Sequence, residues 1–132
     1  MRYTTLASLL ALTLGAGGAA WAQDDLVAQG EKVFKRCAAC HQIGPDAQNK
    51  VGPELTDVIG RQAGTVADFK YSKAMVEFGE AGNVWSNELL HSYLENPRGV
   101  VKGTNMAFAG LKKPEERDAV IAYIESQQAK MN

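Results

Sequence analysis

The feature that most constrains this chain is a short run in which two cysteines enclose two alanines and are followed at once by a histidine: Cys37, Cys40 and His41. This spacing is the attachment pattern for haem c. On one turn of helix, two thiols can add to the two vinyl groups along one edge of a porphyrin, and the next imidazole can reach the iron. The run therefore predicts one covalent haem c, with both cysteines as tethers and His41 as the proximal iron ligand.

Two other kinds of site share this cysteine spacing. A thioredoxin-like redox disulfide also uses Cys-x-x-Cys, but it requires a βαβ context that this sequence lacks. A structural zinc site usually has four protein ligands. Beyond the motif itself, the only remaining cysteine or histidine is His91. We therefore favour haem attachment over a disulfide or a zinc site.

The first residues are typical of a secretory signal peptide. Arg2 gives a basic start, Leu6 to Leu14 form an apolar run, and Ala20-Trp21-Ala22 is a cleavage site of the small-x-small type. We expect residues 1–22 to be removed and residues 23–132 to form one small domain in the periplasm. The alternative is a retained anchor, but the apolar stretch is interrupted by glycines and is shorter than the ~20 residues that a spanning helix needs.

The charge of the chain argues against a nucleic-acid partner but does not decide whether the basic side chains form a patch. The formal net charge of the 132 residues is −1, so we expect no nucleic-acid partner. Several basic side chains either form a local patch after folding or are scattered over a solvated surface. They are Lys32, Lys35, Arg36, Lys102, Lys112 and Lys113.

The periodicity of apolar residues predicts an all-α fold with long loops, since no strand-like alternation is present. We expect a first helix that begins at Asp24 and Asp25 and runs toward Cys37, a short helix over 72–78, a helix over 86–95 that ends at Asn96-Pro97, and a last helix that starts at Pro114. Glycine and proline punctuate the stretch after His41, and residues 98–110 read as a second irregular loop. Loops of this length in a small domain are expected to wrap around a cofactor.

A haem held only by His41 has an open face, and Met106 is the best candidate for the sixth ligand. It lies in a glycine-bearing loop between two predicted helices, from which a thioether can reach the opposite side of the iron. His91 is the rival, although it shares a helix face with polar residues. Met75 and Met131 are interpreted as packing or surface methionines.

These and further motifs together resemble the class I c-type cytochromes, and in particular the bacterial periplasmic relatives of mitochondrial cytochrome c, the c-two type. The resemblance extends from about Gly30 to Gln128. Its segments occur in the family's order: Cys37–His41, Val51-Gly-Pro53-Glu-Leu55, Gly60-Arg61, Trp85, Tyr93-Leu-Glu-Asn-Pro97 and Gly103-Thr-Asn-Met106-Ala-Phe108. It implies the cytochrome c fold, with helices and long loops around one covalently attached haem.

The resemblance also implies roles for individual residues. The carbonyl of Pro53 would accept the ring N–H of His41 and raise the basicity of the imidazole. The hydroxyl of Tyr93 would approach the sulfur of Met106. Four further residues would hydrogen-bond or neutralise the haem propionates: Arg61, Tyr71, Trp85 and Thr104. Gly30 and Phe34 would cross Val120 and Tyr123, which explains a glycine inside the first helix.

The function that follows from the resemblance is one-electron transfer and not enzymatic catalysis. We expect a soluble, monomeric carrier without stable membrane insertion, which moves electrons in a respiratory or related chain from a membrane quinol-oxidising complex to a terminal oxidase, a reaction centre or another periplasmic acceptor. A haem peroxidase would need an open sixth site and a distal acid–base group, and a gas sensor would need an output domain. Gly99, Asn105 and Lys102 depart from the mitochondrial pattern, which makes a strongly acidic partner doubtful.

Overall fold

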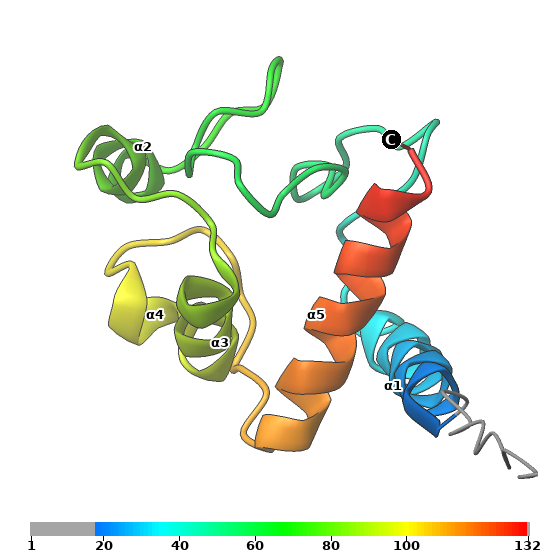
Figure 1. Cartoon of the computed structure of the whole chain (residues 1–132). Helices are drawn as coiled ribbons and strands as arrows, with labels where there is room; N and C mark the ends of the chain where they lie inside the picture. The colour runs from blue at the N-terminus through cyan, green and yellow to red at the C-terminus, as the bar shows by residue number, and fades with distance from the viewer. Residues whose placement is uncertain (1–17, 132) are drawn as a thin grey trace, which may run out of the picture.

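The computed structural model describes residues 18–131, and it contains five helices joined by long loops (Figure 1). No strand occurs among these residues, only an isolated bridge between Gln62 and Val84. The all-α prediction is therefore confirmed. Most of the predicted signal segment, residues 1–17, lies outside the described residues. The helices are α1 (Gly18–Phe34), α2 (Lys73–Glu80), α3 (Asn87–Glu95), α4 (Pro97–Val100) and α5 (Pro114–Ala129).

The crossing of α1 over α5 is the main helix–helix contact of the fold. Gly30 is buried there, and a Cβ on it would collide with the carbonyl of Ala119 and lie 2.7 Å from the Cβ of Tyr123. The rings of Phe34 and Tyr123 stack nearby with their centroids 5.2 Å apart. The absence of a side chain at Gly30 thus lets the two helices meet, as expected from the cost of glycine inside a helix.

The prediction for the start of α1 was wrong. The helix begins at Gly18, so it runs through the expected cleavage point, and Asp24 and Asp25 lie in its middle instead of its first turn. Three alanines in this segment have the highest helix propensity, and no proline or capping residue interrupts them. Cleavage after Ala22 stays a prediction.

Side-chain caps explain where the next helices begin. The hydroxyl of Ser72 accepts from the amide of Met75 at the start of α2, and that of Ser86 accepts from Leu89 at the start of α3, both at 3.1 Å. Such caps satisfy amides that have no partner inside the helix.

The expected loop over 98–110 begins differently, because α4 occupies its first residues. Pro97 ends α3, but it also sits in the first turn of α4, where its missing N–H costs nothing. The side chain of Asn96 accepts from the amide of Gly99 at 3.1 Å and caps this short helix.

Figure 1 shows the chain passing from α1 through the long segment 41–72 to α2, and returning through α3 and α4 to α5. The buried side chains come from all of these parts. They include Phe34, Val58, Trp85, Leu90, Tyr93, Leu111, Val120, Ile121 and Ile124. No helix within residues 18–131 is both long and apolar enough to cross a membrane.

Candidate haem site

The cysteine–histidine run continues from the end of α1 as a series of tight turns. The amides of Cys37 and Ala38 donate to the carbonyl of Phe34 at 2.8 and 2.9 Å. The amides of Cys40 and His41 then donate to the carbonyl of Cys37 at 3.0 and 2.9 Å. This backbone holds two half-buried free thiols and an imidazole within one compact segment. Burial raises the pKa of the Cys37 thiol, an effect that the neighbouring Arg36 partly opposes.

His41 is oriented by a hydrogen bond from its ring. Its Nδ1 lies 2.7 Å from the carbonyl oxygen of Pro53, so Nδ1 carries the proton and donates, and Nε2 keeps a free lone pair. Burial is the largest effect on this group and lowers the pKa of His41, while the Pro53 carbonyl acts in the other direction. The contact implied for Pro53 is therefore present and orients the ring, while burial favours the neutral imidazole that binds a metal.

Gly52 provides the surface against which this ring rests. A Cβ on Gly52 would lie 2.7 Å from Nδ1 and 2.8 Å from Nε2 of His41, closer than ordinary contacts. The amide of Gly52 also donates to the carbonyl of Cys40 at 2.9 Å. The family resemblance includes Gly52 but implies no role for it. Its position directly before the proline that orients the histidine was the available signal.

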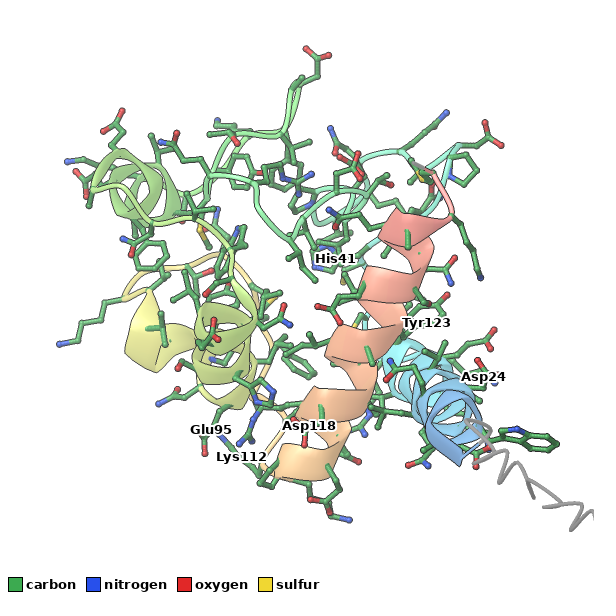
Figure 2. The ribbon with its side chains drawn as sticks, in the orientation of Figure 1. Asp24, His41, Glu95, Lys112, Asp118 and Tyr123 are labelled. Atoms are coloured by element: carbon green, nitrogen blue, oxygen red, sulfur yellow. The ribbon has the colours of Figure 1, made fainter. Side chains whose placement is uncertain are left out.

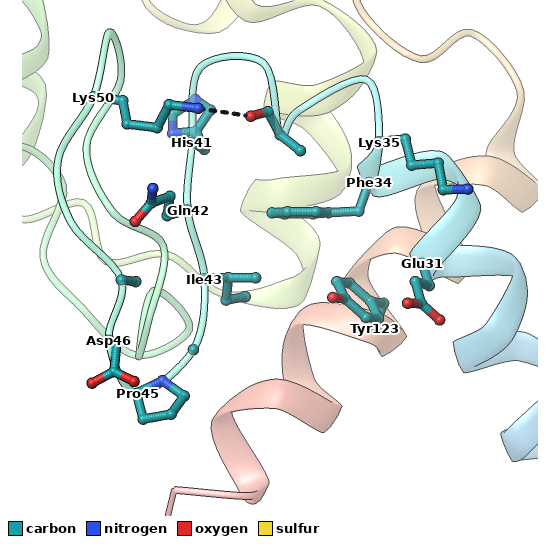
Figure 3. A pocket seen from close by; sticks show the side chains of 13 residues that line it. Glu31, Phe34, Lys35, His41, Gln42, Ile43, Pro45, Asp46, Lys50 and Tyr123 are labelled. Atoms are coloured by element: carbon teal, nitrogen blue, oxygen red, sulfur yellow. Dashed lines mark hydrogen bonds between the residues drawn. The ribbon is translucent and has the colours of Figure 1, made fainter.

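Lys50 also fixes the motif, in a way that the sequence did not reveal. Its ammonium group donates to the carbonyl of Ala38 at 3.2 Å, the contact drawn as a dashed line in Figure 3. Its positive charge also lowers the pKa of His41 slightly further. The loop before Pro53 is thus tied to the segment between the two cysteines.

Met106 lies half-buried against the core cluster, in a loop organised by Thr104. The Thr104 hydroxyl accepts from the amide of Met106 at 3.3 Å and lies 3.3 Å from the hydroxyl of Tyr93. Burial raises the pKa of Tyr93, and its contact with Thr104 opposes the rise. Tyr93 was expected to approach the sulfur of Met106, but its hydroxyl partner in this structure is Thr104. Thr104 thus organises this loop, and its role toward a haem propionate stays a prediction.

The three other residues expected near the haem propionates, Arg61, Tyr71 and Trp85, differ in the hydrogen bonds that they make. The guanidinium of Arg61 donates to Glu54 Oε1 at 3.1 Å and to the carbonyls of Thr56 and Glu54 at 2.8 and 3.1 Å. Tyr71 accepts from the amide of Val66 at 3.1 Å. Trp85 is buried with its ring 4.9 Å from that of Tyr93, and its indole N–H has no hydrogen bond within residues 18–131. Because the Tyr71 hydroxyl acts as the acceptor in its contact with Val66, its own O–H can still donate, so Tyr71 and Trp85 both retain a donor for an anionic group.

The rivals of Met106 are engaged elsewhere. Nε2 of His91 lies 2.9 Å from Oδ1 of Asp118 and links α3 to α5. Met75 is buried within α2, and Met131 is exposed near the end of α5. These positions agree with the interpretation of both methionines as packing or surface residues.

A hollow of about 630 Å³ lies beside His41, between the end of α1, α5 and loop 41–47 (Figure 3). Phe34 and Tyr123 form part of its wall, but Met106 does not. It is thus not the space between the two expected axial ligands. His41 itself lies on the inner side of its loop, toward α5 (Figure 2). The site as a whole fits a haem c, because it offers two free thiols, a neutral imidazole with an available Nε2, and a half-buried thioether.

Several known proteins are similar to this chain in sequence and structure. The family model described as "Cytochrome c" matches residues 27–128. "Cytochrome c2" from Afifella marina is 56% identical over 102 residues, which cover 77% of this chain and 82% of that protein. "Cytochrome c2" from Agrobacterium tumefaciens is 51% identical over 98 residues, covering 74% and 88%. Among solved structures, cytochrome c2 from Rhodospirillum centenum superimposes with a TM-score of 0.74 at 42% identity and covers 76% of this chain and 97% of its own.

Proposed function

The chain belongs to the cytochrome c family, and from this premise we propose that it is a diffusible electron shuttle whose haem iron lies between His41 and Met106. Its relatives place it among the c-type cytochromes of the c2 type, which carry one covalent haem c and act as electron carriers, not as enzymes. When bound, the haem supplies one-electron oxidation and reduction of its iron. The remaining task of the protein is to hold, orient and enclose it.

Cys37 and Cys40 are the proposed tethers, and each would add its S–H across one vinyl group to form a thioether. The turns around the Cys37 carbonyl support this assignment, since they keep both thiols and the imidazole close together. His41 is the proposed proximal ligand. The observation that carries the proposal is the 2.7 Å bond from Nδ1 to the Pro53 carbonyl, because it fixes the ring and leaves the lone pair of Nε2 available to the iron.

Met106 as sixth ligand completes the electron-transfer function. If His41 and Met106 both held the iron, a small molecule would have to displace one of them before it could be activated, and the chemistry left to the haem would be electron transfer. A thioether also raises the reduction potential relative to a harder ligand. The half-buried position of Met106 and the pairing of His91 with Asp118 support this choice.

The biological setting is part of the same proposal. We expect a monomer in the periplasm that begins at Gln23, receives electrons from a membrane quinol-oxidising complex, and passes them to an oxidase, a reaction centre or another acceptor. The bacterial relatives and the signal-like first residues support this setting. N-terminal sequencing of the purified protein tests the cleavage directly, since a start upstream of Gln23 contradicts it.

Replacement of Met106 by alanine tests the ligand assignment. We expect the ferric protein to lose its near-infrared sulfur-to-iron band, to bind added imidazole rapidly, and to have a lower reduction potential. His91→Ala is the matched control, because it removes the rival ligand, and it should keep the band and the potential. An unchanged potential in M106A together with rapid imidazole binding and an altered potential in H91A would mean that the sixth ligand was assigned to the wrong residue.

A further inference from the structure

Arg117 is a buried cation that the proposed function leaves unexplained. It lies in the second turn of α5 with only 7% of its surface exposed. Its Nη1 donates to the carbonyl of Leu111 at 2.6 Å, and its Nη2 is 3.9 Å from a carboxylate oxygen of Glu95. Its Nε has no hydrogen-bond partner within residues 18–131. A buried charge with an unsatisfied donor is costly, so stabilisation of the fold is a poor reason for its presence.

The partner of Arg117 lies at the exit of the loop that carries Met106. The amide of Leu111 donates to the carbonyl of Leu94 at 2.6 Å, and Lys112 Nζ donates to the carbonyl of Glu95 at 2.6 Å. Both acceptors are at the C-terminal end of α3, where carbonyls lack partners within the helix. Figure 2 shows Glu95 and Lys112 close together at this end of the molecule. Residues 111–112 are therefore clamped between α3 and α5.

The stretch between Met106 and this clamp is held by packing, since Phe108 packs against the core and a Cβ on Gly110 would collide with the carbonyl of Glu95. Within the described structure, residues 107–110 donate and accept no backbone hydrogen bond. On the other side, Thr104 holds the amide of Met106 and donates its own amide to Val101 at 3.1 Å. The hydrogen bonds that hold this loop are thus at Thr104 before Met106 and at Leu111 after it, and between them the loop is held by packing alone. Arg117 makes the one side-chain hydrogen bond to the carbonyl of Leu111 among the described residues.

We propose that Arg117 is a positioning residue for Met106: its bond to the Leu111 carbonyl restricts the opening of segment 106–111 and keeps the thioether in place. The proposal rests on the assignment of Met106 as sixth ligand. A hydrogen bond from a charged group is among the stronger ones in a protein interior. Its loss should free the loop locally, whereas replacing a buried cation by an apolar side chain of similar volume often leaves global stability unchanged.

The test compares local opening with global unfolding. In Arg117→Met, the rate at which saturating imidazole displaces the methionine from the ferric holoprotein should rise at least tenfold, which corresponds to about 1.4 kcal/mol. Arg117→Lys, which keeps a cation and a donor, should show a smaller rise. Chemical denaturation of the same variants measures their global stability separately.

Two controls separate positioning from general loosening. Val120→Ala removes buried side-chain volume from the same helix and lowers global stability, but it should leave the imidazole rate near the wild-type value. Arg36→Met removes a second arginine, whose guanidinium lies 2.6 Å from a carboxylate oxygen of Glu116. Because this ion pair is not part of the loop that carries Met106, the imidazole rate should again stay unchanged.

The inference is overturned if R117M binds imidazole at the wild-type rate, or if V120A accelerates binding as much as R117M does. If R117M does not fold, a wild-type rate in Arg117→Leu, which also removes the cation and the donor, has the same consequence. The M106A variant distinguishes this failure from failure of the ligand assignment, because it reports on the sulfur ligand without altering Arg117.

Discussion

Replacement of Gly52 by alanine is a sharp test of how the chain seats His41. The new Cβ would lie 2.7 and 2.8 Å from the two ring nitrogens, whereas ordinary Cβ contacts begin at 3.4 Å. The ring and the backbone must therefore separate by about 0.7 Å at Nδ1 and by more at Cε1, the nearest ring atom, the kind of adjustment that overpacking forces on a crowded site. Because Gly52 directly precedes Pro53, this movement changes the 2.7 Å bond between His41 and the Pro53 carbonyl.

The loss of stability in G52A can be estimated from the overpacking and from the weakened hydrogen bond. Overpacking costs about 1–3 kcal/mol, and a weakened hydrogen bond adds about 1 kcal/mol. We expect G52A to lower the free energy of unfolding of the holoprotein by about 2–4 kcal/mol. Its reduction potential should rise, because an imidazole without this bond is a less basic ligand and stabilises the ferric state less.

Guanidinium titration and potentiometry of G52A and Val51→Ala provide the measurement. Val51 is the matched control, since it is the neighbouring residue and its side chain is 80% exposed. V51A should stay within about 0.5 kcal/mol of wild type, as surface substitutions usually do. The reasoning is refuted if G52A behaves like V51A in both stability and potential.

Two further predictions concern the fold around the site. Gly30→Ala should destabilise the holoprotein by about 1–3 kcal/mol in denaturant titration, because its Cβ meets the Ala119 carbonyl and pushes α1 away from α5. A variant as stable as the wild type would contradict the close crossing of these two helices. Tyr93→Phe should cost about 1 kcal/mol at neutral pH through loss of the Thr104 contact. Because the pKa of Tyr93 is raised in the fold, the unfolded chain releases this proton first, and stability is lost as pH rises above about 10. Y93F should therefore show a shallower alkaline loss of stability, and an unchanged slope would mean that Tyr93 does not couple to folding.

Local signals in the sequence were sufficient for most of the helical framework. Ser72, Ser86 and Pro114 identify helix starts because caps and proline at the first turn act over a few residues. Gly30 also predicted a close helix crossing, since a glycine inside a helix has a cost that a neighbouring backbone explains.

The remaining features depend on contacts between distant segments. The alanine-rich start of α1 continues a helix through a segment that reads as a signal peptide. Nothing in the sequence near Lys50 or Arg117 indicates that one reaches the Ala38 carbonyl and the other the Leu111 carbonyl. The choice of Thr104 as partner of Tyr93 depends likewise on how the 101–111 loop lies over α3.

The central claim is that the protein supplies both axial ligands of the iron. Carbon monoxide titration of the reduced, purified holoprotein near neutral pH, followed by its visible spectrum, tests this most directly. If His41 and Met106 occupy both positions, the spectrum stays unchanged as carbon monoxide is added. Ready binding would show an open or easily displaced position, which contradicts the shuttle and indicates a reactive or sensing iron.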